Sequence, residues 1–149
     1  MEEFQDWLRH EELGEVTPNQ CEVTYINIIR LPDGSNPHTQ LHRISNVWSD
    51  KMVLPPSQTL EHSNVQLVSV FEHGGKSAGR TYITFQPAFT QGDSAEPIVK
   101  LDITVRGKPL GETAAAAFDF LDLARAQVVN TFASITTEEM HKFWERTDA

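Results

Sequence analysis

The sequence predicts an α+β fold, in which a mostly antiparallel sheet of about four strands is covered on one face by a long C-terminal helix. Apolar and polar residues alternate from Ile98 to Arg106, as they do in a strand with one buried face. Apolar residues recur at helical spacing from Thr113 to Ser134. The connections that follow residue 57 have the length of hairpins, and hairpins join antiparallel neighbours.

A short N-terminal helix is expected from Glu2 to Leu13, because Phe4, Trp7 and Leu8 fall on one side of it. The first strand is expected from Cys21 to Arg30. Both of its alternating faces carry apolar residues, and a strand with this pattern is typical of the centre of a sheet. We therefore predict a central position for it.

A long irregular passage is expected from Leu31 to Pro56, because its turn residues are too many for a hairpin. Leu41 to Trp48 is predicted to form a helical turn or a short extended piece within it. The pattern then predicts a second strand from Gln58 to Glu72 and a loop from His73 to Gly79 that reverses the chain.

The third strand is expected from Arg80 to Thr90. The long helix should face the sheet with a set of residues at helical spacing: Ala114, Ala117, Phe118, Leu121, Val128, Phe132 and Ile135. Thr136, with Glu139 three residues later, has the pattern of a capping box and predicts a last short helix.

Length and composition indicate a single domain over residues 1–149, since 39% of the residues are hydrophobic and 22% charged. No stretch approaches the roughly 20 apolar residues that cross a bilayer, so no membrane association is expected. The N-terminus is acidic where a signal peptide would be basic, which favours a cytoplasmic location. Cys21 is the sole cysteine and cannot form an internal disulfide.

The formal net charge of −9 bears on the kind of partner. Lys and Arg residues are scattered singly, whereas nucleic-acid affinity comes largely from clustered cations. Nucleic-acid binding is therefore disfavoured. A negative field attracts basic proteins and raises their encounter rate, so a basic protein partner is favoured.

Two local patterns could carry chemistry, and we favour a structural interpretation of both. Gly74 to Ser77 resembles the end of a phosphate-binding loop, but position 70 is Val where the full pattern needs Gly, so a hairpin loop is expected. His38 and His42 have the spacing of zinc ligands on a helix, but no further ligand completes the set, so loop histidines are expected. The sequence therefore predicts no catalytic residue, no metal and no cofactor.

The stretch from Glu22 to Asn27, which reads E-V-T-Y-I-N, resembles the signature strand of a sporadically distributed family of uncharacterised bacterial proteins. Ile28 follows, as in the family. The passage from Phe118 to Phe132 and the aromatic finish at Phe143 and Trp144 are also similar. The resemblance covers the second half of a typical member. It implies the fold and a bacterial or mobile-element origin, implies no reaction, and is compatible with accessory roles in defence or toxin control.

The chain departs from the family pattern in two places. Members begin with another sheet-forming segment, so this chain is expected to be either a shortened homologue or a fragment. Members also tend to carry a histidine in the last long helix, where this sequence has Ala124-Arg125. Any catalytic role of that histidine would be lost here.

These features favour a non-enzymatic protein-binding or regulatory accessory module, such as an immunity-type subunit related to defence or toxins. A sheet that lacks its neighbour exposes an edge that can pair with a protein partner or with a second copy in a homo-oligomer. The alternative is a small-molecule-binding or hydrolytic enzyme with a pocket between helix and sheet. That pocket would be lined by Tyr25, Asn27, His62, His73 and Tyr82, and it requires these five side chains to converge.

Asn27 stands among apolar residues of the first strand. A buried Asn must satisfy both its amide and its carbonyl group. We expect it to bond to the backbone of the passage from Leu31 to Pro56 and so to act as a structural pin.

Overall fold

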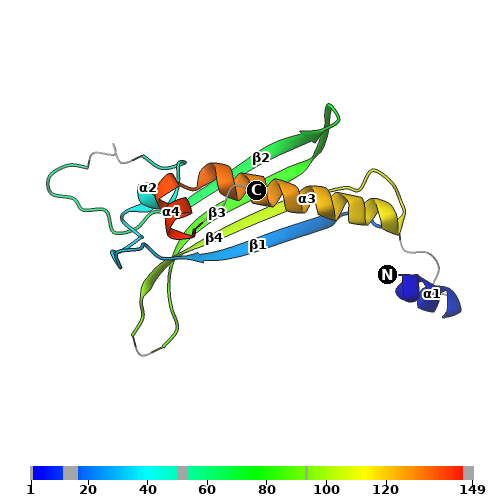
Figure 1. Cartoon of the computed structure of the whole chain (residues 1–149), viewed down its shortest axis with the longest axis horizontal. Coiled ribbons are helices and arrows are strands. Elements are labelled where there is room, and N and C mark those ends of the chain that lie inside the picture. The colour runs from blue at the N-terminus through cyan, green and yellow to red at the C-terminus, as the bar shows by residue number, and fades with distance from the viewer. Residues whose placement is uncertain (1, 12–16, 50–53, 93, 146–149) are drawn as a thin grey trace.

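A computed structural model describes residues 2–11, 17–49, 54–92 and 94–145. Its elements run in the order α1 (Glu2–His10), β1 (Cys21–Ile29), α2 (Leu41–Ile44), β2 (Val65–His73), β3 (Lys76–Phe89), β4 (Pro97–Gly107), α3 (Ala114–Ile135) and α4 (Glu138–Phe143) (Figure 1). The strands form one four-stranded sheet in the order β1-β4-β3-β2, and all neighbours are antiparallel. The α+β prediction, with a long C-terminal helix on an antiparallel sheet, is confirmed.

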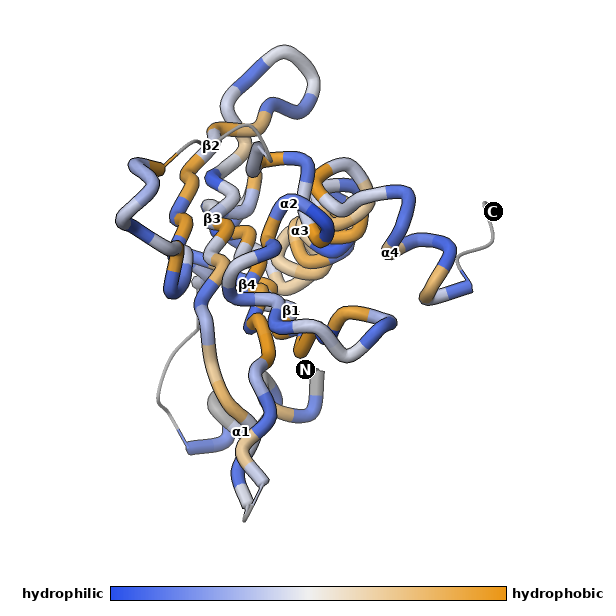
Figure 2. The backbone as a smooth tube through the Cα atoms, turned by 90° about the vertical axis from the view of Figure 1, so that its left-hand side faces the viewer, coloured by the Kyte–Doolittle hydropathy of each residue, from blue (hydrophilic) through white to orange (hydrophobic). Residues whose placement is uncertain are grey.

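The helices α2, α3 and α4 lie on the same side of the sheet, as the view along the strands shows (Figure 2). We call this side the covered face and the opposite side the open face. Cross-strand register assigns Tyr25, Ile103, Ile83 and Leu67 to one row of the covered face. Strand residues of this face and helix residues make up the core, which includes Phe85, Leu101, Ile103, Val105, Phe120, Ala124 and Val128.

The strand that begins at Cys21 was predicted to be central, and that prediction was wrong. Within the described residues, β1 pairs only with β4 and forms one edge of the sheet. Its covered-face residue Ile29 is buried, but Ile26 and Ile28 on the open face are 60% and 51% exposed. Apolar residues on both faces therefore did not signal burial on both faces.

Two glycines form the turn of the hairpin between β2 and β3. Gly74 and Gly75 have φ angles of 60° and 74°, in the left-handed region that favours glycine and that tight hairpin turns require. The strands therefore extend into the expected loop from His73 to Gly79. The register of β2 shifts between Phe71 and Glu72, and β2 begins at Val65, later than predicted.

Helix α3 begins after Thr113, whose side-chain oxygen accepts a hydrogen bond from the Ala116 amide at 3.2 Å. The residues that it buries are Ala117, Phe120, Ala124, Val128 and Thr131. Phe118 was expected to face the sheet and is instead 50% exposed. The buried stripe, which includes the large Phe120, is turned away from Phe118 and packs on β1 and β4.

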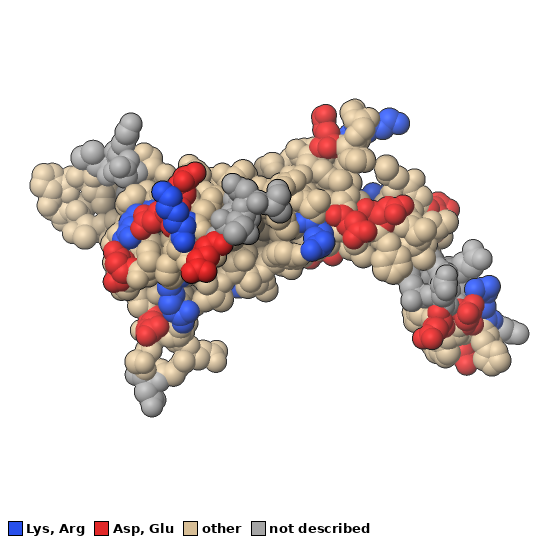
Figure 3. Space-filling model, in the orientation of Figure 1, with Lys and Arg blue, Asp and Glu red and all other residues tan. Residues whose placement is uncertain are grey.

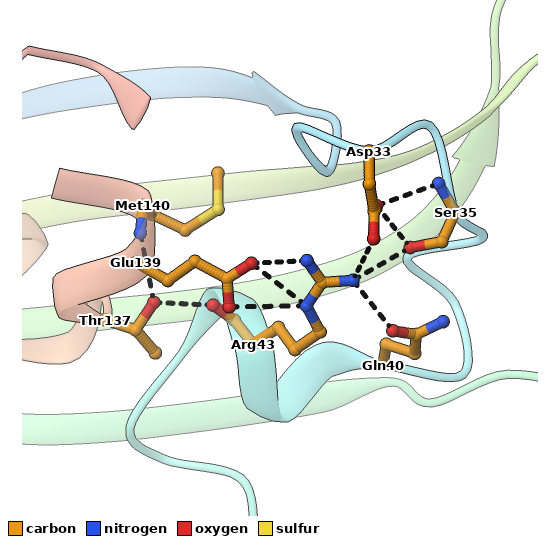
Figure 4. A network of polar contacts seen from close by, with 7 residues as sticks. All are labelled: Asp33, Ser35, Gln40, Arg43, Thr137, Glu139 and Met140. Carbon is orange, nitrogen blue, oxygen red and sulfur yellow. Dashed lines mark hydrogen bonds and ion pairs between the residues drawn. The ribbon is translucent and has the colours of Figure 1, made fainter. Parts of the chain in front are cut away.

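The irregular passage before α2 is held against α4 by Arg43 (Figure 4). The Arg43 guanidinium forms ion pairs with Glu139 and, at 2.8 Å, with Asp33. It also donates to Ser35 Oγ and Gln40 Oε1, both at 3.0 Å. Charged side chains of both signs gather over this end of the molecule (Figure 3).

The start of α4 completes this junction. Thr137 is the residue that caps α4, one position after the predicted Thr136, and its hydroxyl donates to the Arg43 carbonyl oxygen at 2.5 Å. Ser45 forms an isolated bridge with Thr136. Hydrogen bonds therefore tie α2 to the segment between α3 and α4.

Two carboxyl groups of this network have lowered pKa values. Hydrogen bonds from the Ser35 hydroxyl and amide, and then from Arg43, lower the pKa of Asp33 to about 2. The hydrogen bond from Arg43 lowers the pKa of Glu139.

His38 was expected to be an ordinary loop histidine but is buried. Its Nε2 lies 3.0 Å from the Ala88 carbonyl oxygen and 2.9 Å from that of Ile98. Since carbonyl oxygens only accept, Nε2 carries the proton and donates to them. His38 therefore fastens the irregular passage to β3 and β4.

Candidate protein-binding edge of the sheet

Within the described residues, the outer edge of β1 combines an unpaired backbone with exposed apolar side chains. Nine residues of β1 run in unbroken register with β4, from Cys21 opposite Gly107 to Ile29 opposite Val99. The strand contains neither Pro nor Lys, which are residues that commonly protect an edge from pairing. An edge of this kind offers its N–H and C=O groups to another strand.

A groove runs beside this edge at the Ile29 end of β1. It has a volume of about 570 Å³ and is lined by four consecutive strand residues and two aromatic residues: Ile26, Asn27, Ile28, Ile29, Phe132 and Trp144. The Phe132 and Trp144 rings pack with their centroids 5.2 Å apart. The groove therefore has a backbone edge on one side and an aromatic wall from α3 and the end of α4 on the other.

The side of α3 that faces the groove is apolar except for Arg125. Residues of α3 recur there at intervals of three, four, four and three, which places them in one stripe: Phe118, Leu121, Arg125, Val129 and Phe132. We call this stripe the α3 flank. Phe132 lines the groove, so the flank lies on the β1 side of the helix. Phe118 and Val129 are 50% and 49% exposed.

Asn27 lies on the covered face at the floor of the groove. Its Nδ2 donates to the Leu101 carbonyl oxygen at 3.3 Å. The expected bond to the passage from Leu31 to Pro56 is not found among the described residues, because Leu101 stands directly opposite Asn27 and offers the nearer carbonyl. Within the described chain the Asn27 Oδ1 makes no hydrogen bond, so an acceptor remains at the groove.

The two ends of β1 carry opposite charges. Glu22 pairs with Arg106 at 2.5 Å near the start of the strand. Arg30, just past its end, lies 3.4 Å from Glu96. All four side chains remain substantially exposed, so Glu22 and Arg30 can meet further charges.

The five side chains predicted to share a pocket do not meet. Tyr25 and Asn27 lie on the covered face of β1, whereas Tyr82 lies on the open face of β3 in the row of Thr24 and Thr104. His73 lines a separate hollow of about 340 Å³ at the start of α3. His62 is exposed in the segment that precedes β2. The described residues thus give no single concavity between helix and sheet that holds all five.

Tyr82 lines a different hollow of about 520 Å³, at the end of the open face where β3 and β4 meet the segment before β1. Three cationic residues line it with Ser77, namely Arg80, Arg106 and Lys108. Arg80 and Arg106 are direct cross-strand neighbours. Arg106 lies over the Tyr82 ring and pairs with Glu22, whereas Arg80 and Lys108 form no ion pair within the described residues.

The part of the chain that the structure describes holds no group of three or more His, Cys, Asp or Glu residues arranged to bind a metal ion. None of its helices has the length and apolar character that crossing a bilayer requires.

The aromatic wall of the groove could be foreseen only in part. Phe132 and Trp144 belong to the C-terminal passage whose aromatic residues stand out in the sequence. No sequence pattern, however, places them beside β1. No protein-family model, curated protein or solved structure matches the chain.

Proposed function

We propose that the protein is a protein-binding accessory module that takes up another polypeptide chain along the outer edge of β1. The observation that carries this proposal is the unpaired β1 edge with exposed Ile26 and Ile28, which lies beside the groove walled by Phe132 and Trp144. Backbone hydrogen bonds along such an edge supply affinity, and side-chain pockets supply selectivity.

A binding role is favoured over catalysis by the dispersal of the polar residues. Tyr25 and Tyr82 lie on opposite faces of the sheet, and His73 lines a hollow at the start of α3. A hydrolytic site requires its acid, base and nucleophile within hydrogen-bond reach of one substrate position.

Site-specific photocrosslinking tests this proposal. A benzophenone amino acid replaces Ile26 in one variant and Val68 in another, and both are irradiated in the cells that produce the protein. Val68 is a matched control, because it is 55% exposed on the open face of the other edge strand. We expect a discrete adduct with a second polypeptide chain from position 26 alone. Equal labelling from both positions, or none from position 26, would contradict the proposal.

A second candidate function is the binding of a small anion in the hollow of Arg80, Arg106 and Lys108. Two like charges directly opposite each other on a sheet are unfavourable, and a bound anion relieves their repulsion. The gathering of three cations is notable in a chain of net charge −9.

Calorimetric titration with pyrophosphate tests this second candidate. We expect binding that weakens by at least roughly 10-fold in Arg80→Gln, since a charge-assisted hydrogen bond contributes about 1.5–3 kcal/mol. Lys142→Gln, on α4 and outside the hollow, should bind as the parent protein does. Equal affinity of all three proteins would exclude a specific anion site.

A further inference from the structure

We propose that the chain bound at the β1 edge is a second copy of this protein, paired antiparallel through β1 to give one continuous sheet across both copies. This inference rests on the proposed function and names its partner. A two-fold axis perpendicular to the sheet relates antiparallel strands, so the two copies would present their covered faces on the same side.

Charge selects the register of this pairing. When Ile26 lies opposite the partner's Ile26, Glu22 stands opposite the partner's Arg30 at each end of the joint. The neighbouring registers that preserve the two faces instead put Glu22 opposite the partner's Ile28 or the partner's Pro32. Opposite charges stabilise a cross-strand pair, so the register centred on Ile26 is favoured.

The same register fills the groove. On the covered face it places the partner's Tyr25 opposite Asn27 and the partner's Val23 opposite Ile29. Both side chains then enter the groove in front of the Phe132 and Trp144 wall. The partner's Tyr25 stands beside the Asn27 Oδ1, the acceptor that has no hydrogen bond within the described chain.

Helix spacing provides an independent argument for a second copy. Helix α3 contacts β1 and β4 to nearly the same extent, so its axis lies above the space between them. Neighbouring strands are about 4.8 Å apart, so the two-fold axis lies half that distance outside β1 and the axis of α3 lies half that distance inside it. In projection, the two-fold axis is therefore about 5 Å from each helix axis. The two α3 helices would therefore lie about 10 Å apart, a distance at which helices pack directly.

The α3 flank has the composition that such a helix pair requires. It would bring exposed Phe118 and Val129 against the partner's flank. Because the helices would run antiparallel, Arg125 would approach the partner's Asp122, and neither residue forms an ion pair among those described.

The α3 flank also distinguishes a second copy from an unrelated peptide as the partner of β1. A single extended peptide could pair with β1 and occupy the groove, but it would leave Phe118 and Val129 in water. A second copy supplies both a strand for the edge and a helix for the flank. Of the two occupants, only the second copy accounts for both surfaces.

Sedimentation velocity on the purified full chain tests the inference, with the mass checked by light scattering. We expect a dimer at micromolar concentration. Ile26→Lys should weaken the dimer at least about 100-fold, because it places two ammonium groups together on the two-fold axis. Val68→Lys, an equally exposed change on the opposite edge, should remain dimeric. A monomeric parent protein, or a dimer that Ile26→Lys leaves intact, would overturn the inference.

A covalent test covers the case in which Ile26→Lys fails to fold. Ile26→Cys in a Cys21→Ser chain should form an intermolecular disulfide on mild oxidation, since paired strand residues have the Cα separation that a disulfide needs. Val68→Cys in the same background should remain monomeric on a non-reducing gel. Equal cross-linking of the two variants would contradict the β1 register.

The binding role of the β1 edge and self-association through it can be refuted independently. A monomeric protein whose position 26 photocrosslinks to a different polypeptide would refute self-association and keep the binding role of the edge. A monomer with no adduct at position 26 would refute both.

Discussion

Asn27 lies opposite Leu101 in the β1–β4 ladder and donates its Nδ2 hydrogen to the Leu101 carbonyl oxygen at 3.3 Å. This bond supplements the backbone ladder of an edge strand. It also explains how a polar residue is accommodated among the apolar residues of the covered face.

Replacing Asn27 with Leu should therefore lower stability. Loss of one half-buried hydrogen bond costs about 1 kcal/mol, which corresponds to a decrease in Tm of roughly 2–4 °C for a chain of this size. Calorimetric melting measures the change. Thr24→Val on the open face of the same strand is the comparison: it removes the exposed hydroxyl pair with Thr104 at 2.8 Å, and because water replaces an exposed bond it should change Tm less. An unchanged Tm together with lost association would instead assign Asn27 to the interface.

Two buried threonines should respond in opposite directions to the same substitution. Thr81 is fully buried, and its Oγ1 has no hydrogen-bond partner within the described residues. Thr136 is also buried, but its hydroxyl donates to the Phe132 carbonyl oxygen at 2.7 Å. Thr81→Val should raise the free energy of unfolding by about 1 kcal/mol, whereas Thr136→Val should lower it by a similar amount. Urea denaturation measures both, and a shared sign would contradict the assignment.

Gly79 should not tolerate a larger side chain. A Cβ atom at this position would lie 2.5 Å from the Arg106 carbonyl oxygen and 2.7 Å from Phe71 Cε1. Gly79→Ala should therefore destabilise the fold by about 1–3 kcal/mol. Gly111→Ala is the comparison, because its Cβ would approach nothing closer than the Ala116 methyl group at 3.2 Å. Thermal melting of the two variants should separate them, with Gly111→Ala nearer the parent protein.

Acid should loosen the junction between the irregular passage and α4. The pKa of Asp33 is about 2 in the folded chain, below its ordinary value of 3.8, and the pKa of Glu139 is lowered as well. Lowered carboxyl pKa values stabilise the fold above the unfolded-state values, and this stabilisation disappears as pH falls through the folded-state values. Unfolding should become easier between about pH 4.5 and pH 2.

Carboxyl NMR titration of two variants identifies the donors. Ser35→Ala should raise the pKa of Asp33, because it removes the hydroxyl hydrogen bond that is the largest cause of the shift and keeps the amide hydrogen bond. Arg43→Gln should raise the pKa of Glu139 most strongly. Unmoved titrations in both variants would show that this network does not form in solution.

Periodicity predicted the elements whose environment is uniform along their length. β4 alternates between buried and partly exposed residues, and α3 repeats at helical spacing, so both were found within about two residues of their ends. β2 began later than predicted, because the polar alternation from Gln58 to Asn64 does not pair with another strand within the described residues.

The site was less accessible to sequence reasoning, for a physical reason. Alternation separates the two faces of each strand, but it does not show which face a helix covers or which strand lies at an edge. Tyr25 and Tyr82 were therefore assigned to one pocket although they lie on opposite faces. Apolar side chains at Ile26 and Ile28 predicted burial, whereas both are exposed on the open face of an edge strand.

The register shift between Phe71 and Glu72 places an extra residue, Ala78, on β3 and leaves β2 without an insertion. Pairing through β1 would therefore leave β2 as the outermost strand on both sides of the joint, with exposed Leu67, Val68 and Val70. The bulge on β3 increases the local twist only at the hairpin end of that edge. A charge at position 68 would thus have a second use, because charged residues protect an exposed edge against the addition of further strands.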